Sequence, residues 1–423
     1  MRSAAADLLV IGAGVVGAAC ALAAARAGLQ VTVLDRGPVA GGSTGAGEGN
    51  LLVSDKAPGA ELDLALLSLR LWAEVAEFCT ARSGLPAGGF EFETKGGLMV
   101  AAGDAGLGRA RGLAVGQRTA GVRADDVAAA DLPRLEPHLA RDLAGGVLYP
   151  QDSQVQPMLA AAQMLAAARQ LGAQVRTGAE VVGLLRIGDR VTGVRTRQQQ
   201  LPAGAVLNAA GSWAGGVAAM AGVEVPVLPR RGVILVTEPL PPLIRHKVYA
   251  AEYVGDVASD QAGLESSPVV EGTASGTVLI GASRERVGFD ASVPLPVLRR
   301  LAAQAVGLFP VLAGVAVLRA YRGYRPYCPD HLPVIGADPR APGLLHACGH
   351  EGAGIGLATG TGALIAQLLT GAVPDLDLTP FRPHRFPTPT PTRPSCSPQP
   401  PDSDAESAPK GGHGEHQRAG EAG

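Results

Sequence analysis

Cysteine is scarce in this sequence of 423 residues, which holds five: Cys20, Cys79, Cys328, Cys348 and Cys396. They are odd in number and widely spaced, and no two form a CxxC pair. This distribution argues against a disulfide framework, a zinc site or a cysteine-held iron–sulfur cluster within the chain. We therefore expect no metal site, and the cysteine usage predicts a cytoplasmic location.

Strong net charge and long apolar runs are also missing. The formal net charge is −2, which gives no reason to expect a nucleic acid or an anionic membrane as a partner. Apolar residues are abundant, but glycines and charges interrupt them before any run resembles a membrane span. We expect a soluble protein, whose length allows two domains or one large α/β domain with an insertion.

What is present begins with a β-α-β unit. Residues 7–11 are apolar and β-branched, a pattern typical of a buried parallel strand. Residues 16–27 are rich in alanine and predict a helix that ends at a glycine, and residues 31–34 predict a second strand. Asp35 follows this strand, about 20 residues after the first turn, where a carboxylate would bind the ribose of an adenosine.

The turn between strand and helix, residues 12–17, reads Gly-Ala-Gly-Val-Val-Gly, the GxGxxG pattern of dinucleotide-binding folds. Gly12 permits the tight turn, Gly14 lets a pyrophosphate approach the backbone, and Gly17 lets helix and strand pack closely. The helix N-terminus offers free N–H groups to the phosphates. A glycine-punctuated helical hairpin or a signal peptide is the alternative, and it leaves Asp35 unexplained.

Residues 36–50 form a glycine-rich polar stretch that contains Arg36, Ser43, Thr44 and Glu48. Such a stretch is either a solvated linker or a backbone surface pressed against a ligand. Because it directly follows the strand that would hold the adenosine, we expect it to run along the pyrophosphate and the rest of the cofactor.

The pattern of apolar and polar residues changes twice along the sequence, which predicts a second domain. Residues 90–142 and 225–325 alternate apolar and polar positions, as in an antiparallel sheet with one solvated face. Within them, the strand candidates are residues 90–94, 97–101, 231–237, 248–254, 269–270 and 277–281. The other segments, residues 1–89, 143–224 and 326–385, read as one discontinuous dinucleotide-binding domain. We expect an α/β fold, α+β overall, in which an antiparallel-sheet substrate domain is inserted into a Rossmann-like domain. The proline-rich residues 386–423 predict a disordered tail.

Two later segments also suit a dinucleotide. Residues 205–213 read as a buried strand that runs into a turn of small residues, where backbone could touch the ligand. Residues 344–348 predict a strand, and residues 349–356 form a glycine-rich turn that opens a helix over residues 357–369. Such a turn places unpaired N–H groups and the positive end of the helix dipole at one spot. That spot suits an anion, or a ring carbonyl that gains charge during a reaction.

Together these motifs resemble the D-amino-acid oxidase superfamily of FAD enzymes. The residues that carry the resemblance are the opening glycine turn with Asp35, Ser43-Thr44-Gly45, the turn from Asn208 to Trp213, Arg325-Pro326 with Asp330, and the turn over residues 349–356. The resemblance covers roughly residues 5–380. It is strongest to glycine oxidase, sarcosine oxidase and the flavin β-subunits of hydroxyproline, opine and hydrogen-cyanide-forming dehydrogenases. The order of motifs is specific for the superfamily and not for a substrate.

The resemblance implies an FAD cofactor. Sarcosine oxidases hold their flavin through a cysteine, whereas Gly323 stands at the corresponding spacing here, so we expect non-covalent FAD. The helix dipole behind the late glycine turn would favour the negative charge that reduction places on the flavin. The residues that the resemblance assigns to FAD are Gly12, Gly14, Val15, Val16, Gly17, Asp35, Arg36, Ser43, Thr44, Gly49, Asn50, Val181, Ala210, Gly211, Trp213, Gly349, Gly352, Ala353, Gly354 and Ile355.

The resemblance also implies three catalytic candidates, Arg325, His350 and Tyr324. Arg325 matches the position that binds the substrate carboxylate in relatives, and its planar guanidinium suits that role. A structural salt bridge is the alternative for Arg325, and a backbone-bonded histidine near the site is the alternative for His350. Arg230 and Arg231 would lie over the flavin, or form surface or structural ion pairs.

The implied reaction is oxidation of the CH–NH bond of a small amino or imino acid by hydride transfer to flavin N5. A D-amino acid, glycine, sarcosine, D-proline and hydroxyproline are the substrate types that the resemblance suggests. Proximity and orientation would supply most of the acceleration. The alternatives are a flavin-binding accessory or assembly subunit without turnover, and a nicotinamide-dependent dehydrogenase.

Electron transfer out of the flavin is a separate question. An oxidase would pass the electrons to oxygen. A dehydrogenase would need partner subunits, because the chain has no cluster of its own, and the resemblance suggests an iron–sulfur subunit and a second flavoprotein.

Overall fold

The computed structural model describes residues 6–83, 89–257 and 259–386. Apart from Phe386, the predicted disordered tail lies outside the described residues, and so does Cys396. The cysteines within the described part, Cys20, Cys79, Cys328 and Cys348, are buried and free.

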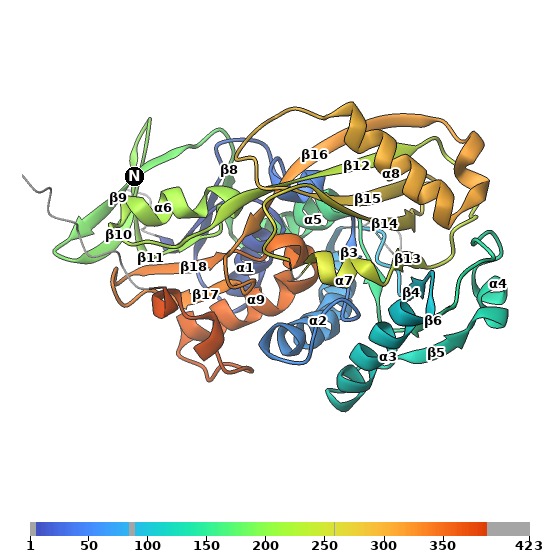
Figure 1. The fold of residues 1–423 in the computed structure, drawn as a ribbon. Helices are drawn as coiled ribbons and strands as arrows, with labels where there is room; N and C mark the ends of the chain where they lie inside the picture. The colour runs from blue at the N-terminus through green and yellow to red at the C-terminus, as the bar shows by residue number, and fades with distance from the viewer. Residues whose placement is uncertain (1–5, 84–88, 258, 387–423) are drawn as a thin grey trace, which may run out of the picture. The chain divides into compact units, whose positions relative to one another are not determined.

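One sheet is built on the N-terminal unit (Figure 1). β1 (Ala6–Ile11) lies parallel between β2 (Val31–Leu34) and β11 (Gln200–Asn208). The sheet continues through β8 (Gln174–Arg176) beside β2, and through β18 (Leu344–Cys348) and β17 (Val334–Ala337) beyond β11. The hairpin of β9 (Val181–Ile187) and β10 (Arg190–Thr196) extends from β11. Segments far apart in the sequence therefore meet in one largely parallel sheet.

Helices pack on this sheet and on one another. They are α1 (Val15–Arg26), α2 (Ala60–Ser83), α5 (Pro157–Gln170), α6 (Ala214–Met220) and α9 (Gly354–Thr370). Small residues permit the contact between α1 and α9, because a side chain at Gly362 would lie 2.7 Å from the carbonyl oxygen of Ala19. By length and composition alone, the segment Glu351–Thr370 could cross a membrane. In this fold it packs against α1 and α2 as a core helix.

The second sheet unites the two predicted insertions. Its order is β16-β12-β15-β14-β13-β4-β6-β5. The first insertion supplies β4 (Gly97–Ala101), β5 (Asp125–Ala128) and β6 (Gly145–Tyr149). The second supplies β12 (Leu228–Thr237), β13 (Lys247–Ala250), β14 (Glu265–Gly272), β15 (Val278–Arg284) and β16 (Val317–Tyr327). They are joined where β13 pairs with β4, and this pair is parallel, whereas the other pairs in this sheet are antiparallel.

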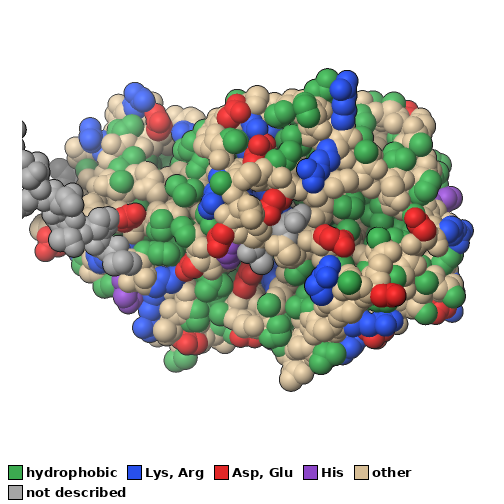
Figure 2. Space-filling model, viewed as in Figure 1, with side chains coloured by type: hydrophobic (Ala, Val, Ile, Leu, Met, Phe, Trp, Pro, Cys, Tyr) green, Lys and Arg blue, Asp and Glu red, His purple; other side chains and the backbone are tan. Residues whose placement is uncertain are grey.

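Helices also accompany the second sheet. α8 (Leu295–Leu308) packs across β12, β14 and β15, as Figure 1 shows. α3 (Asp104–Thr119) packs on β4 and β6, and α7 (Glu252–Val257) on β14. A short helix, α4 (Leu132–Leu135), follows β5. On the face drawn in Figure 2, basic and acidic side chains are interspersed, in keeping with the near-neutral net charge.

The architecture confirms the predicted fold class and corrects three details. Residues 90–94 form no strand, because Glu91 adopts φ +56° and breaks the extended chain, leaving an isolated bridge from Glu93 to Gln154. β6 pairs in the second sheet, so the boundary expected at residue 143 moves past Tyr149. The strand expected to reach residue 254 ends at Ala250, where α7 soon begins.

Candidate functional site

A cavity of about 430 Å³ lies between the two sheets. Its walls include the carboxyl ends of β1, β2 and β11, the turn that follows β18, and strands β12 and β16. Loops at the carboxyl ends of parallel strands are where α/β folds bind ligands. The cavity connects Asp35 and Val181 at the first sheet with Tyr253 and Arg325 at the second.

Two glycines of the first turn have no room for a side chain. A Cβ on Gly12, whose φ is +116°, would overlap the carbonyl oxygen of Ala209, and a Cβ on Gly17 would overlap the carbonyl oxygen of Gly12. The backbone N–H of Val15 donates to Thr44 Oγ1 at 3.0 Å. Within the described residues no group accepts from the N–H of Val16. The N-terminus of α1 therefore presents an unsatisfied donor and a positive dipole end to the cavity.

Asp35 is held rigidly at the end of β2. Its two carboxylate oxygens accept hydrogen bonds from the backbone N–H groups of Ala13 and Gly37, each at 2.8 Å. Each oxygen keeps further lone pairs, so the carboxylate can still accept bonds from hydroxyl groups in the cavity. The next side chain, Arg36, lies 4.1 Å from the ring centroid of Trp213, which ties the loop after β2 to the turn after β11.

The late glycine turn carries His350 into the core. Gly349 adopts φ +74°, and α9 then begins without a capping side chain. His350 Nε2 lies 3.0 Å from Thr361 Oγ1, and burial lowers the pKa of His350 to about 3. His350 therefore stays neutral near pH 7 and bonds to a side chain of α9, not to the backbone.

Arg325 lies on β16 with its guanidinium against Gly232 and Gly352. Its Nη1 donates to the carbonyl oxygen of Ser283 at 2.8 Å. Burial lowers the pKa of Arg325, and the neighbouring Arg284 lowers it further. Arg325 lines the cavity. No carboxylate in the described residues forms an ion pair with it. The structural salt bridge that was the alternative for this residue is therefore absent from this part of the chain.

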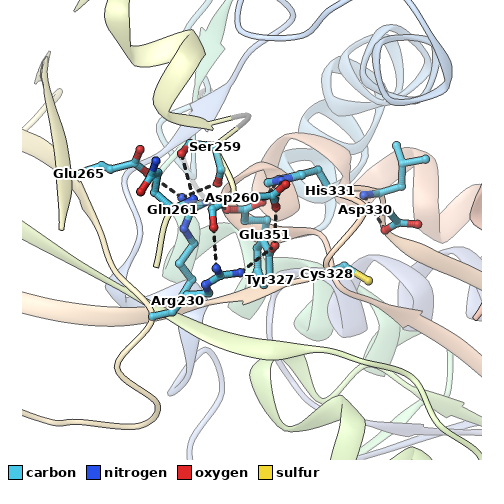
Figure 3. Close-up of polar contacts among 12 residues, drawn as sticks. Arg230, Ser259, Asp260, Gln261, Glu265, Tyr327, Cys328, Asp330, His331 and Glu351 are labelled. Carbon is cyan, nitrogen blue, oxygen red and sulfur yellow. Dashed lines mark hydrogen bonds and ion pairs between the residues drawn. The ribbon is translucent and has the colours of Figure 1, made fainter. Parts of the chain in front are cut away.

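Arg230 and Arg231 are occupied by acidic partners (Figure 3 shows those of Arg230). Arg230 pairs with Glu351 at 2.6 Å and with Glu265 at 3.1 Å. Arg231 pairs with Glu285 and Asp290, both at 2.6 Å. These contacts favour the structural-pairing alternative for both arginines.

Two tyrosines border the cavity in different ways. The hydroxyl group of Tyr324 donates to the carbonyl oxygen of Phe289 at 2.9 Å, so its proton is already engaged. Tyr253 lies on α7 and lines the cavity. The guanidinium of Arg284 lies 5.0 Å from the centroid of the Tyr253 ring.

Most of the predicted site residues line this cavity: Gly12, Gly14, Val15, Val16, Asp35, Arg36, Ser43, Thr44, Asn50, Val181, Ala210, Gly211, Trp213, Tyr324, Arg325, His350, Gly352, Gly354 and Ile355. The others lie behind it. Gly17 packs on Gly12, Gly49 on the carbonyl group of Val155, and Gly349 on Cys328. Ala353 ends the turn that precedes α9.

Three acidic residues, Glu48, Glu180 and Glu351, also line the cavity and were not predicted as site residues. Glu48 is the only charged residue between Arg36 and Asp55, which is the signal that could have drawn attention to it. Glu351 is held by Arg230 and by His331, whose Nδ1 lies 3.1 Å from Glu351 Oε2. Burial would raise the pKa of Glu351, but its bonds to His331 and Arg230 lower it overall.

A family model described as FAD dependent oxidoreductase matches residues 7–368. The chain belongs to this family. Among curated relatives of this FAD-dependent oxidoreductase, hydrogen cyanide synthase subunit HcnC from Pseudomonas aeruginosa is 31% identical over 90% of this chain and 96% of its own length. Glycine oxidase from Pseudomonas putida is 32% identical, but the alignment spans 48% of this chain and only 52% of that protein.

A solved structure shows the same family fold. The crystal structure of glycine oxidase from Geobacillus kaustophilus has a TM-score of 0.81 and 26% identity, and it covers 90% of this chain and 99% of that one. The cofactor is accordingly FAD. The cavity fits that assignment, because it joins a carboxylate at the end of β2, the uncapped N-terminus of α1 and the turn before α9 in one continuous space.

Proposed function

We propose that this protein oxidises the CH–NH bond of a small amino or imino acid with non-covalently bound FAD. The observation that carries the proposal is Arg325, a buried guanidinium that lines the cavity without an ion-pair partner among the described residues. A planar guanidinium binds a carboxylate through two parallel hydrogen bonds. The relatives named glycine oxidase support a substrate with both a carboxylate and an amine.

FAD, when bound, supplies the acceptor for the hydride that leaves the substrate carbon. The chain's own residues bind and orient the substrate. Arg325 would hold its carboxylate, and Gly232 and Gly352, which have no side chains, would leave room beside the Arg325 side chain. The substrate loses the hydride with its electron pair, and the nitrogen lone pair forms the C=N bond. Water then hydrolyses the imine, or a cyclic imine persists.

His350 would not act as the base in this reaction. Its pKa of about 3 results from burial, and its Nε2 contacts Thr361. We infer that His350 supports the turn before α9, where it keeps the cavity wall in place. Proximity to a fixed carboxylate anchor would supply much of the acceleration.

The names of the relatives point to two different routes for the electrons that leave the reduced flavin. HcnC is named as a subunit of hydrogen cyanide synthase, which supports a dehydrogenase that works with partner subunits. We propose that these partners are an iron–sulfur protein and a second flavoprotein. Glycine oxidase supports direct use of oxygen. We also propose a cytoplasmic location, because the described cysteines are free.

The test begins with the visible spectrum of the purified protein. Glycine, sarcosine, D-proline and D-hydroxyproline are then added in turn without oxygen. We expect one of them to bleach the flavin bands, and we expect Arg325→Met to need at least tenfold more of it. Admitting air separates fast recolouring by an oxidase from slow recolouring by a dehydrogenase. A yellow protein that none of these compounds bleaches would favour the accessory-subunit alternative.

A further inference from the structure

One charged residue of the cavity wall, Glu48, has no part in the reaction as proposed above. Glu48 lines the cavity and its side chain is 6% exposed. Its Oε2 accepts a hydrogen bond from Asn50 Nδ2 at 2.8 Å. Its Oε1 has no hydrogen-bond partner in the described residues. A buried carboxylate oxygen without a donor is costly, so this atom points to a ligand.

The fold makes room for this oxygen. A Cβ on Gly281 would overlap Glu48 Oε1 and lie 3.2 Å from its Cδ and 2.9 Å from Ile234 Cδ1. Ile234 also lines the cavity. A side chain at position 281 would therefore displace the carboxylate, and glycine at this position keeps Oε1 beside the cavity.

Glu48 has a buried basic neighbour, Lys247, but it shares this neighbour with a second acid, Glu271. Lys247 Nζ lies 3.9 Å from Glu48 Oε2 but 3.6 Å from Glu271 Oε2, and it forms no hydrogen bond with either. Burial opposes the charge on Lys247, yet the two carboxylates raise its pKa above the ordinary value. Lys95 also acts on Glu271, and it has an acidic neighbour of its own in Glu93 at 3.9 Å. In this cluster of three acids and two bases, the acids outnumber the bases by one.

The opposite charge lies across the same cavity. Arg325 and Glu48 both line it, and Glu48 is one of the charges that act on the Arg325 guanidinium. A cation and an anion with free hydrogen-bonding atoms in one cavity match the two ends of an amino acid. Arg325 suits the carboxylate, and Glu48 suits the nitrogen.

We propose that Glu48 binds the amine of the substrate and selects small amino or imino acids over ether acids of the same shape, which have no N–H group to donate. The inference rests on the proposed function. Oε1 accepts a hydrogen bond from the substrate N–H group. When the hydride leaves and the C=N bond forms, positive charge develops on the nitrogen, and the fixed carboxylate stabilises that charge. Glu48 therefore contributes to both binding and the rate of oxidation.

The test compares Glu48→Gln with Glu271→Gln. Glutamine has the size of glutamate and can still accept from Asn50, but it then turns an N–H donor toward the substrate nitrogen. Glu271→Gln removes a charge from the same buried cluster at a residue that does not line the cavity. The ligands are sarcosine, or whichever of the four amines reduces the wild-type flavin, and its ether analogue, methoxyacetate for sarcosine or tetrahydro-2-furoate for proline.

Two readouts are needed. Anaerobic stopped-flow reduction gives the dissociation constant and limiting rate for the amine, and perturbation of the flavin absorbance gives the dissociation constant of the ether acid. We expect Glu48→Gln to weaken the amine about 10- to 100-fold and to slow its oxidation, because a hydrogen bond to a charged group is lost. We expect its affinity for the ether acid to stay within about twofold of wild type.

Equal weakening of amine and ether acid in Glu48→Gln would overturn the proposal, since it would indicate a general disturbance of the cavity. So would an effect of Glu271→Gln as large as that of Glu48→Gln. Unchanged amine kinetics in Glu48→Gln, with a reducible wild type, would overturn the role of Glu48 alone. A wild-type flavin that no amine reduces would overturn both this proposal and the proposed function.

Discussion

Adding one methyl group at Gly232 should disable the carboxylate anchor without touching the cofactor half of the cavity. Gly232 pairs with Gly323 between β12 and β16, and the Arg325 guanidinium lies directly over it. In Gly232→Ala the new carbon would overlap Arg325 Nη1 and lie 2.7 Å from Cζ and 2.8 Å from Nη2. Because non-bonded carbon contacts need about 3.5 Å, the guanidinium must retreat by about 1 Å.

That displacement sets the expected size of the effect. Misplacing a reacting or anchoring group by about 1 Å can reduce catalysis by about 100-fold, which corresponds to about 2.7 kcal/mol. We therefore expect kcat/KM for the amine to fall about 100-fold in Gly232→Ala, with most of the loss in KM. The FAD content and the flavin spectrum should match wild type, because Gly232 does not touch the first turn.

The matched control is Gly307→Ala on α8, where an added Cβ would contact nothing within 4 Å. This variant should keep wild-type kinetics and be slightly more stable, since alanine favours a helix. A Gly232→Ala enzyme that is fully loaded with FAD and has wild-type kcat/KM would refute the assignment of Arg325 to the substrate carboxylate.

Three further predictions concern the cofactor domain. Asp35→Ala should raise the dissociation constant of FAD at least about tenfold, measured by flavin release on dilution, because two backbone N–H groups lose their acceptor. Gly17→Ala should lower the melting temperature and the FAD content together, since its Cβ would overlap the carbonyl oxygen of Gly12; equal melting temperatures for Gly17→Ala and wild type would contradict the close packing there. His350→Asn should lose less stability than wild type on acidification from pH 7 to pH 5. The unfolded chain takes up a proton near pH 6.5, whereas the folded His350, with a pKa of about 3, does not, and this costs wild type about 2 kcal/mol at pH 5. Urea unfolding of both proteins at the two pH values measures that difference.

The N-terminal unit was predictable because its signals are local. A short β-branched run, three spaced glycines and an acid at the end of the next strand each fix one feature of the backbone. The structure places β1, α1 and β2 within one residue of the expected bounds. The resemblance also directed attention to Arg325, although no local pattern had marked β16 as a strand.

The missed features depend on contacts between distant segments. Glu48 looked like one more polar residue in a glycine-rich loop, and its burial results from β13, β14 and β15, which lie some 200 residues later. The strand predicted over residues 90–94 does not form, because the alternation of apolar and polar residues cannot reveal the positive φ of Glu91. The acidic partners of Arg230 likewise come from β14 and from the turn before α9.

The order in which the chain passes between the two sheets has a consequence for synthesis on the ribosome. The second sheet is complete only when β16 has emerged, at Tyr327, and the first only when β18 can lie beside β11, at Cys348. The turn and helix that finish the cavity come later still, ending at Thr370. Nascent chains shorter than this would expose unpaired strand edges and could hold no flavin in a finished cavity. We therefore expect cofactor loading to be a late event, and we expect a chain that stops before α9 to bind chaperones and proteases instead of acting as a partly active enzyme.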